Sequence, residues 1–278
     1  MTRSMRRRLG MLVRTILAWS VILLINFPLL WMISSSLKND RENNSLPLTI
    51  LPREIELGNY ARVLTGDFWM WALNSLIVAS GTVVLVIVVA TLAAYSLTRY
   101  TYRGRNALAS VVLFTYLFPP VLMLVPIFLI ITHLGLSNTR LALILATTTF
   151  ALPFALWLLR SYFLSVTMDT EEAAMIDGAS RFQAFFEIVI PQVSPGVIST
   201  AIFTFIIAWD EYLFASVFIS SPERKTLPIG IAGYANELTA EWGILMAASV
   251  AAAVPVLILF AFLQRRLLPD LNAGSTKA

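Results

Sequence analysis

The chain has 278 residues, of which 58% are hydrophobic and 13% charged, and its formal net charge is +4. Ordinary soluble domains carry roughly 45–50% apolar and about 25% charged residues, so the composition argues against that class. The absence of cysteine excludes disulfides and thiol chemistry, and a single histidine argues against a histidine metal site or catalytic relay. In a membrane protein Lys and Arg report orientation, so the net charge does not indicate nucleic-acid binding.

Six apolar blocks have 19 to 31 residues each, and a membrane-spanning helix needs roughly 20. They are residues 15–37, 68–98, 107–132, 141–159, 197–220 and 242–263. Only the fifth block contains charged residues, Asp210 and Glu211. The blocks are too long for barrel strands, so we expect an all-α membrane protein with six transmembrane helices. Prolines at 119, 120, 126 and 153 predict kinks in the third and fourth spans.

The basic residues favour one orientation. With the N-terminus inside, the inside segments hold 13 of the 20 Lys and Arg residues, and the outside segments hold 7. This bias predicts that both termini are cytoplasmic. The first block is longer than a signal-peptide core and no Ala-x-Ala-like site follows it, so we expect a retained anchor.

The polar connections divide the chain into three parts. Residues 1–67 comprise an N-terminal tail, the first span and an outside loop, in which a short helix is expected near residues 59–64. Residues 68–268 comprise five spans and a large cytoplasmic loop at 164–196, and residues 269–278 form a tail.

The loop at 164–196 is predicted to form two short helices at an angle. Asp169 is expected to cap a helix that begins at Thr170, and Gly178 is expected to end it. Ser180 with Gln183 offers a second helix start. An apolar stripe follows at helical spacing: Phe182, Phe185, Phe186 and Val189.

The acidic residues of the first short helix favour a protein partner. Helices that lie on a membrane surface usually carry Lys and Arg, whereas this one carries paired carboxylates. The alternative, a helix pair at the lipid interface with solvated glutamates, stays open at this point.

Two stretches of the chain resemble a known family. Glu172-Ala173-Ala174, then Gly178, then Ile188-x-Ile190-Pro191 resembles the EAA motif of binding-protein-dependent ABC importer permeases. Ile190 stands where the family prefers leucine. From the second span onward, the outline resembles carbohydrate-importing permeases of the maltose-transporter type, which often have a Trp-Asn-Glu-Phe-like string where this chain has Trp209-Asp210-Glu211-Tyr212.

The resemblance implies a type I ABC importer permease fold with a cytoplasmic coupling helix that docks in a cleft of an ATPase subunit. By that likeness the coupling residues are Glu171, Glu172, Ala173, Ala174, Asp177, Gly178, Ile188 and Pro191. It also implies a second permease subunit, two copies of the ATPase and a periplasmic or lipoprotein substrate-binding protein, in a bacterial or archaeal cytoplasmic membrane. The chain has no phosphate-binding loop, so ATP and Mg²⁺ are expected in the ATPase subunits, and no catalytic residue, metal or cofactor is expected here.

Five polar or aromatic residues are candidates for the substrate pathway. Carboxylates within a span usually face a polar interior, so Asp210 and Glu211 are expected to accept hydrogen bonds from a sugar while Trp209 and Tyr212 stack on it. The alternative is that these carboxylates lie near the outer interface, or pair with a companion subunit, and only fix geometry. Asn74 is a weaker candidate, for which helix–helix packing is the alternative.

Two other classes of protein compete with an importer subunit. An ion-driven secondary transporter could use Asp210 and Glu211 as ion sites, but no internal repeat is visible and the acidic loop would have no role. A membrane-embedded enzyme is disfavoured by the lack of clustered polar residues on facing spans.

Overall fold

The computed structural model describes residues 3–235 and 241–274, which form helices joined by turns and loops, with no strand among them. Five of these helices are long and apolar enough to cross a membrane, or six if one bent pair is counted as a single span. This confirms the predicted all-α fold, and the six predicted spans correspond to the five long helices and the bent pair. The chain divides into two compact units: Met1–Asp67 with Ile231–Ala253, and Phe68–Gly230 with Val254–Ala278.

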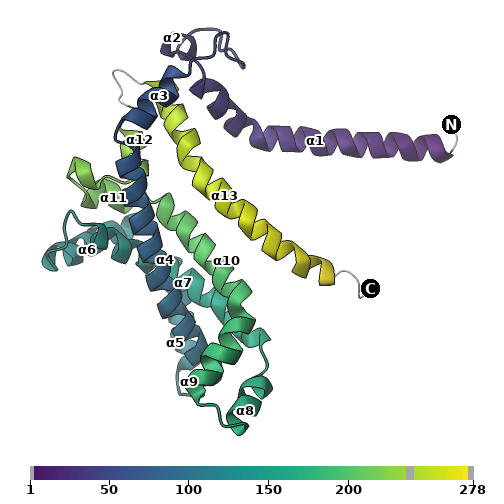
Figure 1. Cartoon of the computed structure of the whole chain (residues 1–278), viewed down its shortest axis with the longest axis vertical. Helices are drawn as coiled ribbons and strands as arrows, with labels where there is room; N and C mark the ends of the chain where they lie inside the picture. Colours follow the sequence, from purple (N-terminus) through teal and green to yellow (C-terminus); the bar gives the residue numbers. More distant parts are fainter. Residues whose placement is uncertain (1–2, 236–240, 275–278) are drawn as a thin grey trace. The chain divides into compact units, whose positions relative to one another are not determined.

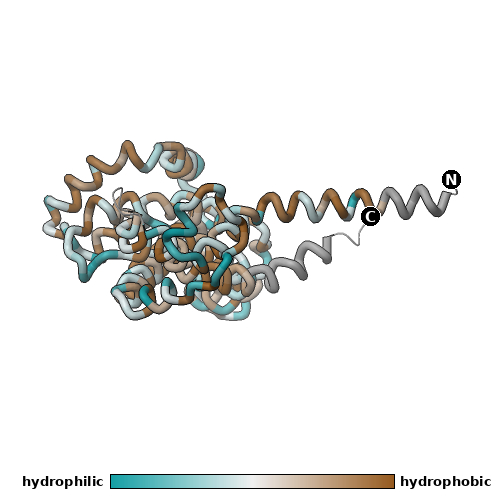
Figure 2. The backbone as a smooth tube through the Cα atoms, turned by 90° about the horizontal axis from the view of Figure 1, so that it is seen from above, coloured by the Kyte–Doolittle hydropathy of each residue, from teal (hydrophilic) through white to brown (hydrophobic). Residues whose placement is uncertain are grey.

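The first unit contains α1 (Arg3–Ser36), α2 (Asp40–Asn43), α3 (Gly58–Thr65) and the first part of α13 (Trp242–Gly274). Hydrophobic residues predominate along Met11–Ser36 of α1 (Figure 2). The short helix expected near residues 59–64 is confirmed as α3. Arg62 of α3 forms an ion pair of 2.6 Å with Glu241.

The loop after α1 is ordered around two buried charges. Lys38 is 2% exposed, and its ammonium donates to the Thr49 carbonyl and lies 4.7 Å from the centroid of the Trp31 ring. Glu42 accepts hydrogen bonds from Thr49 Oγ1 at 2.8 Å and from the Arg53 backbone N–H at 3.0 Å. The bond from Thr49 is the main reason why the pKa of Glu42 is lowered.

In the second unit, α4 (Phe68–Arg99), α7 (Arg140–Ser165) and α10 (Ile190–Trp209) pack side by side (Figure 1). Alanines fill the seam of α4 and α7, at Ala90, Ala94, Ala151 and Ala155, and each is at most 1% exposed. Small residues let membrane helices approach closely, which is why these apolar helices associate without a hydrophobic driving force between them.

The third apolar block is broken rather than kinked. It forms α5 (Arg105–Thr115) and α6 (Pro120–His133), which meet at an angle of 101°. Pro119 disfavours a helical conformation at Phe118, and Pro120 occupies the first position of α6, where its missing N–H costs nothing.

The fifth apolar block begins and ends earlier than expected. A continuous helix runs from Arg181 through α9 (Arg181–Gln183), the π-helical η1 (Ala184–Val189) and α10 to Trp209. The loop predicted to extend to residue 196 therefore ends earlier, because Pro191 lies in the first turn of α10 and Pro195 inside it. The remaining elements are α8 (Met168–Ile176), α11 (Leu213–Phe218), the short η2 (Pro222–Arg224) and α12 (Leu227–Ala232).

Candidate functional site

The predicted loop between the fourth and fifth spans folds as α8 followed by a sharp turn into α9. The helix begins at Met168 with Thr167 as N-cap, so the prediction that Asp169 caps it is wrong by two residues. Gly178 ends the helix as predicted, with a φ of +95° that side chains rarely adopt. The predicted start at Ser180 and Gln183 is confirmed as a complete capping box.

The two adjacent carboxylates of α8 face different surroundings. Glu171 is 4% exposed and points into the second unit, whereas Glu172 is exposed. Among the other predicted coupling residues, Ala173, Asp177, Gly178 and Pro191 are exposed, and Ala174 and Ile188 are half-buried. The structure therefore leaves Glu172, and not Glu171, available to an outside partner.

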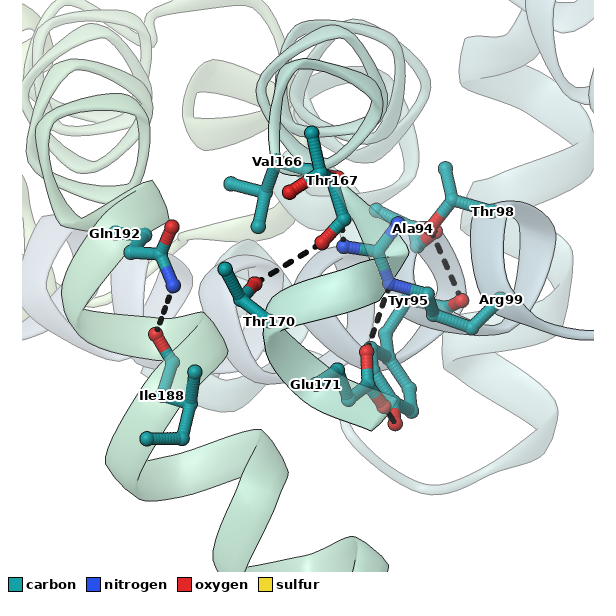
Figure 3. Close-up of polar contacts among 10 residues, drawn as sticks. All are labelled: Ala94, Tyr95, Thr98, Arg99, Val166, Thr167, Thr170, Glu171, Ile188 and Gln192. Carbon is teal, nitrogen blue, oxygen red and sulfur yellow. Dashed lines mark hydrogen bonds and ion pairs between the residues drawn. The ribbon is translucent and has the colours of Figure 1, made fainter. Parts of the chain in front are cut away.

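Glu171 is held by two residues at the end of α4 (Figure 3). Arg99 Nε donates to Glu171 Oε2 at 2.9 Å, and the Tyr95 hydroxyl donates to Glu171 Oε1. Arg99 also donates to the Val166 carbonyl at 3.1 Å, just before α8 begins. The side chains of Arg99 and Glu171 are only 3% and 5% exposed, so this is a buried ion pair whose acceptors and donors are largely satisfied within the chain.

Sequence reasoning missed this cluster. In the sequence, Arg99 is one of the 13 basic residues on the predicted inside, and Tyr95 belongs to none of the motifs described above. Arg99 is the only charged residue of the 32-residue α4, and a lone charge at the end of an apolar span, together with a carboxylate pair in a nearby loop, was the available signal.

The aromatic stripe after Gly178 divides between two faces. Phe185 and Val189 are buried, while Phe182 and Phe186 are 72% and 49% exposed. Because residues 184–189 are π-helical, the turn is wider than the α-helical spacing that predicted a single stripe. The ring of Phe185 packs edge-on against Tyr95, with the two centroids 4.7 Å apart.

The four residues predicted at the substrate pathway lie where α10 ends and α11 begins. This break is about 30 Å from the start of α10, at a rise of about 1.5 Å per residue. Glu211 accepts hydrogen bonds from the backbone N–H groups of Phe214 at 2.7 Å and Ala215 at 3.0 Å, so it caps α11. Trp209 is buried and stacks on Phe205, with centroids 5.5 Å apart, whereas Asp210 and Tyr212 are exposed.

Asn74 has structural partners in the second unit. Its amide donates to the carbonyls of Glu223 at 2.9 Å and Lys225 at 2.8 Å, and its oxygen accepts from Arg140 Nε at 2.8 Å. It thereby joins α4, α7 and the segment around η2. This geometry matches the packing alternative for Asn74, and none of these partners lies in residues 209–212.

Metal ligands are not gathered anywhere in the described part of the chain. No group of three or more His, Cys, Asp or Glu side chains lies close enough to hold an ion among residues 11–235 and 241–262, whose side chains the structure describes.

Solved structures of similar shape are importer permeases. A chain from a bacterial ABC transporter involved in the import of the polysaccharide alginate superposes with a TM-score of 0.81, covering 96% of this chain and 99% of that one at 24% identity. Another, from the alginate transporter in complex with its pentasaccharide-bound periplasmic protein, gives a TM-score of 0.67 over 92% of this chain and 93% of that one at 16% identity. These likenesses support the fold.

Named proteins with similar sequences are transport system permeases. The chain is 39% identical to the sulfoquinovosyl glycerol transport system permease protein of Agrobacterium fabrum, over 92% of this chain and 91% of that protein. It is 37% identical to the trehalose/maltose transport system permease protein of Thermococcus litoralis, over 90% and 91%. The model of the family described as binding-protein-dependent transport system inner membrane component matches residues 86–273. The chain belongs to this family of transporter permeases, as the motif between Glu172 and Pro191 indicates.

Proposed function

We propose that the chain is one permease subunit of an ATP-driven importer, and that it forms half of the pathway for a sugar or sugar derivative delivered by an external binding protein. A second permease subunit supplies the other half. Two copies of an ATPase subunit bind ATP and Mg²⁺, so this chain is a transport subunit and not an enzyme.

The observation that carries the proposal is the exposed face of α8. Glu172 stands free beside small residues, Ala173 and Ala174, which allow another protein to approach the helix closely. A carboxylate in that position is suited to pair with an Arg or Lys in a groove of the ATPase subunit. Its neighbour Glu171 is already paired within the chain, so of the two glutamates Glu172 is the docking carboxylate.

Orientation follows from the same face. The ATPase subunits are cytoplasmic, which places α8 and both termini in the cytoplasm, in line with the excess of basic residues on that side. The break at Asp210 then lies toward the outer half of the membrane, and the binding protein meets the outer loops.

The substrate class rests on the relatives. Their names refer to sulfoquinovosyl glycerol, trehalose or maltose, and diacetylchitobiose, all of which are carbohydrates or their glycosides. In this chain Asp210 and Tyr212 are the pathway residues with exposed side chains, so we propose that they contact the sugar. Trp209 and Glu211 hold this segment in place: Trp209 packs on Phe205, and Glu211 caps α11.

Reconstitution tests the proposal. The chain is co-expressed with a second permease subunit, an ATPase subunit and a binding protein from the same organism, and the purified complex is placed in proteoliposomes with ATP inside. Uptake of a radiolabelled sugar that the binding protein retains, dependent on both ATP and binding protein, is expected. Uptake that follows an ion gradient without ATP would overturn the proposal.

A further inference from the structure

Two side chains one turn apart on α4 hold both arms of the coupling loop, residues 164–196. Arg99 binds Glu171 of α8 and the Val166 carbonyl before it. Tyr95 donates to Glu171 through its hydroxyl, while its ring contacts Phe185 of η1. The end of α7 joins the same cluster through Phe163, whose ring centroid lies 6.1 Å from that of Tyr95.

The chemistry of this cluster suits the fixing of positions more than the gain of stability. Removing an ion pair from water costs roughly as much as the attraction returns, so apolar residues of equal size would serve stability as well. Hydrogen bonds to charged groups are short and directional, and they resist sliding in a way that apolar contacts do not. Arg99 and Glu171 are separated by 72 positions in the sequence, so their bond ties the coupling loop to a distant span.

On the basis of the proposed function, we propose that Tyr95, Arg99 and Glu171 are positioning residues that make α8 and α4 move as one body. Glu172 receives the force from the ATPase subunit, and Glu171, the next residue, passes it to α4. Without these hydrogen bonds, α8 moves with the ATPase subunit but α4 does not move with α8. ATP is then hydrolysed without import.

The first test measures transport per ATP hydrolysed in the reconstituted complex. The double variant Arg99→Met/Glu171→Met removes both charges together, so that no buried charge is left unpaired. We expect it to assemble and hydrolyse ATP, while uptake per ATP falls by roughly fivefold or more, the scale of typical coupling between sites. The double variant Arg99→Lys/Glu171→Asp keeps both charges in the cluster and is expected to retain most of the ratio.

Matched controls remove a nearby charge and leave Tyr95, Arg99 and Glu171 unchanged. Asp169→Asn lies on the same helix and Arg103→Gln follows the same span, and both residues are exposed. Each is expected to leave uptake per ATP at the wild-type value.

The second test measures the distance between α8 and α4 directly. The chain has no cysteine, so Met168→Cys on α8 and Leu92→Cys on α4 provide two labelling sites in this subunit, at residues that are 44% and 55% exposed. We expect the spin-label distance to stay constant between the nucleotide-free and ATP-bound complexes. In the Arg99→Met/Glu171→Met background it is expected to change on ATP binding.

The outcomes separate the two proposals. An unchanged ratio of uptake to ATP in the double variant overturns the positioning role alone. If the double variant fails to assemble, the labels in the otherwise wild-type complex decide, because a distance that changes on ATP binding overturns the role. A wild-type complex without ATP-driven uptake overturns the proposed function and this inference with it.

Discussion

Neighbouring residues on a helix point about 100° apart, and on α8 this angle separates two roles. Glu171 turns inward to Arg99 and Tyr95, while Glu172 turns outward. The two adjacent glutamates therefore do not supply two negative charges to a docking partner. One carboxylate belongs to the interior of this chain, and one is available to a partner.

Charge reversal at the outward position tests the docking assignment. We expect Glu172→Lys to leave the chain folded but to reduce ATP-dependent uptake by about tenfold or more, since an interfacial charge pair becomes a repulsion. The measurement is uptake by the reconstituted complex beside its thermal stability. Asp169→Lys, on the exposed side of the same helix, is the matched control. Normal uptake by Glu172→Lys would contradict the assignment.

The burial of Trp209 changes what its removal should do. The sequence suggests stacking on a sugar, yet the side chain is 7% exposed and packs on Phe205. We therefore expect Trp209→Ala to lower the stability of the chain by about 3–5 kcal/mol, as for other buried aromatics. Trp209→Phe should retain most of it.

Tyr212→Ala serves as the comparison for that measurement. Tyr212 is 49% exposed, so its truncation should spare thermal stability and weaken uptake instead. A stable Trp209→Ala variant with weakened uptake would contradict the packing role and indicate that Trp209 contacts the substrate.

At the scale of elements, the sequence predicts features that depend on neighbouring residues, such as turns and caps. It does not predict features that depend on contacts between distant segments. Gly178 and the pair Ser180 and Gln183 act within a few residues, so their turn and capping box were predictable. The inward orientation of Glu171 depends on a partner 72 positions away. The N-cap of α8 is Thr167 instead of Asp169, only two residues after α7 ends at Ser165.

The π-helical segment and the break after Trp209 explain two further differences. A regular 3.6-residue period predicts one apolar stripe, but six π-helical residues displace Phe182 and Phe186 from the buried face. A continuous apolar run predicts a span through residue 220, but Glu211 supplies a cap that starts a new helix at Leu213. Hydrophobicity alone contains neither signal.

Close packing between α7 and α10 depends on one glycine. A β-carbon at Gly196 would lie 2.3 Å from Tyr162 Cγ and 2.9 Å from its Cβ, which cannot swing away like the tip of a flexible side chain. We expect Gly196→Ala to destabilise the chain by about 1–3 kcal/mol, the range for overpacking. Thermal unfolding in detergent measures the loss, and adding Tyr162→Ala should recover part of it. A neutral Gly196→Ala would show that the two helices separate freely.

For the whole molecule, composition predicted the class and the number of spans, because lipid imposes length and apolarity on every crossing segment. It did not predict the 101° break at Pro119 and Pro120, since proline permits a kink or a break and tertiary contacts choose between them. The proposed orientation rests on the docking of a cytoplasmic ATPase subunit at α8 and on the distribution of basic residues.

Single cysteines test that orientation, because the native chain has none. Glu54→Cys and Glu223→Cys replace exposed residues on the proposed outer side, and Asp169→Cys replaces one on the proposed inner side. A membrane-impermeant maleimide should label the first two in intact spheroplasts and the third only after permeabilisation. The reverse pattern would invert the topology and remove α8 from reach of a cytoplasmic ATPase.

The opposed orientations of Glu171 and Glu172 also predict where second-site suppressors arise. Mutations that restore growth to a Glu171 mutant should fall in the same gene, at codons for α4 such as 95 or 99, since its partners are all in this polypeptide. Suppressors of a Glu172 mutant should instead map to the gene for the ATPase. Two adjacent codons would thus belong to separate genetic networks.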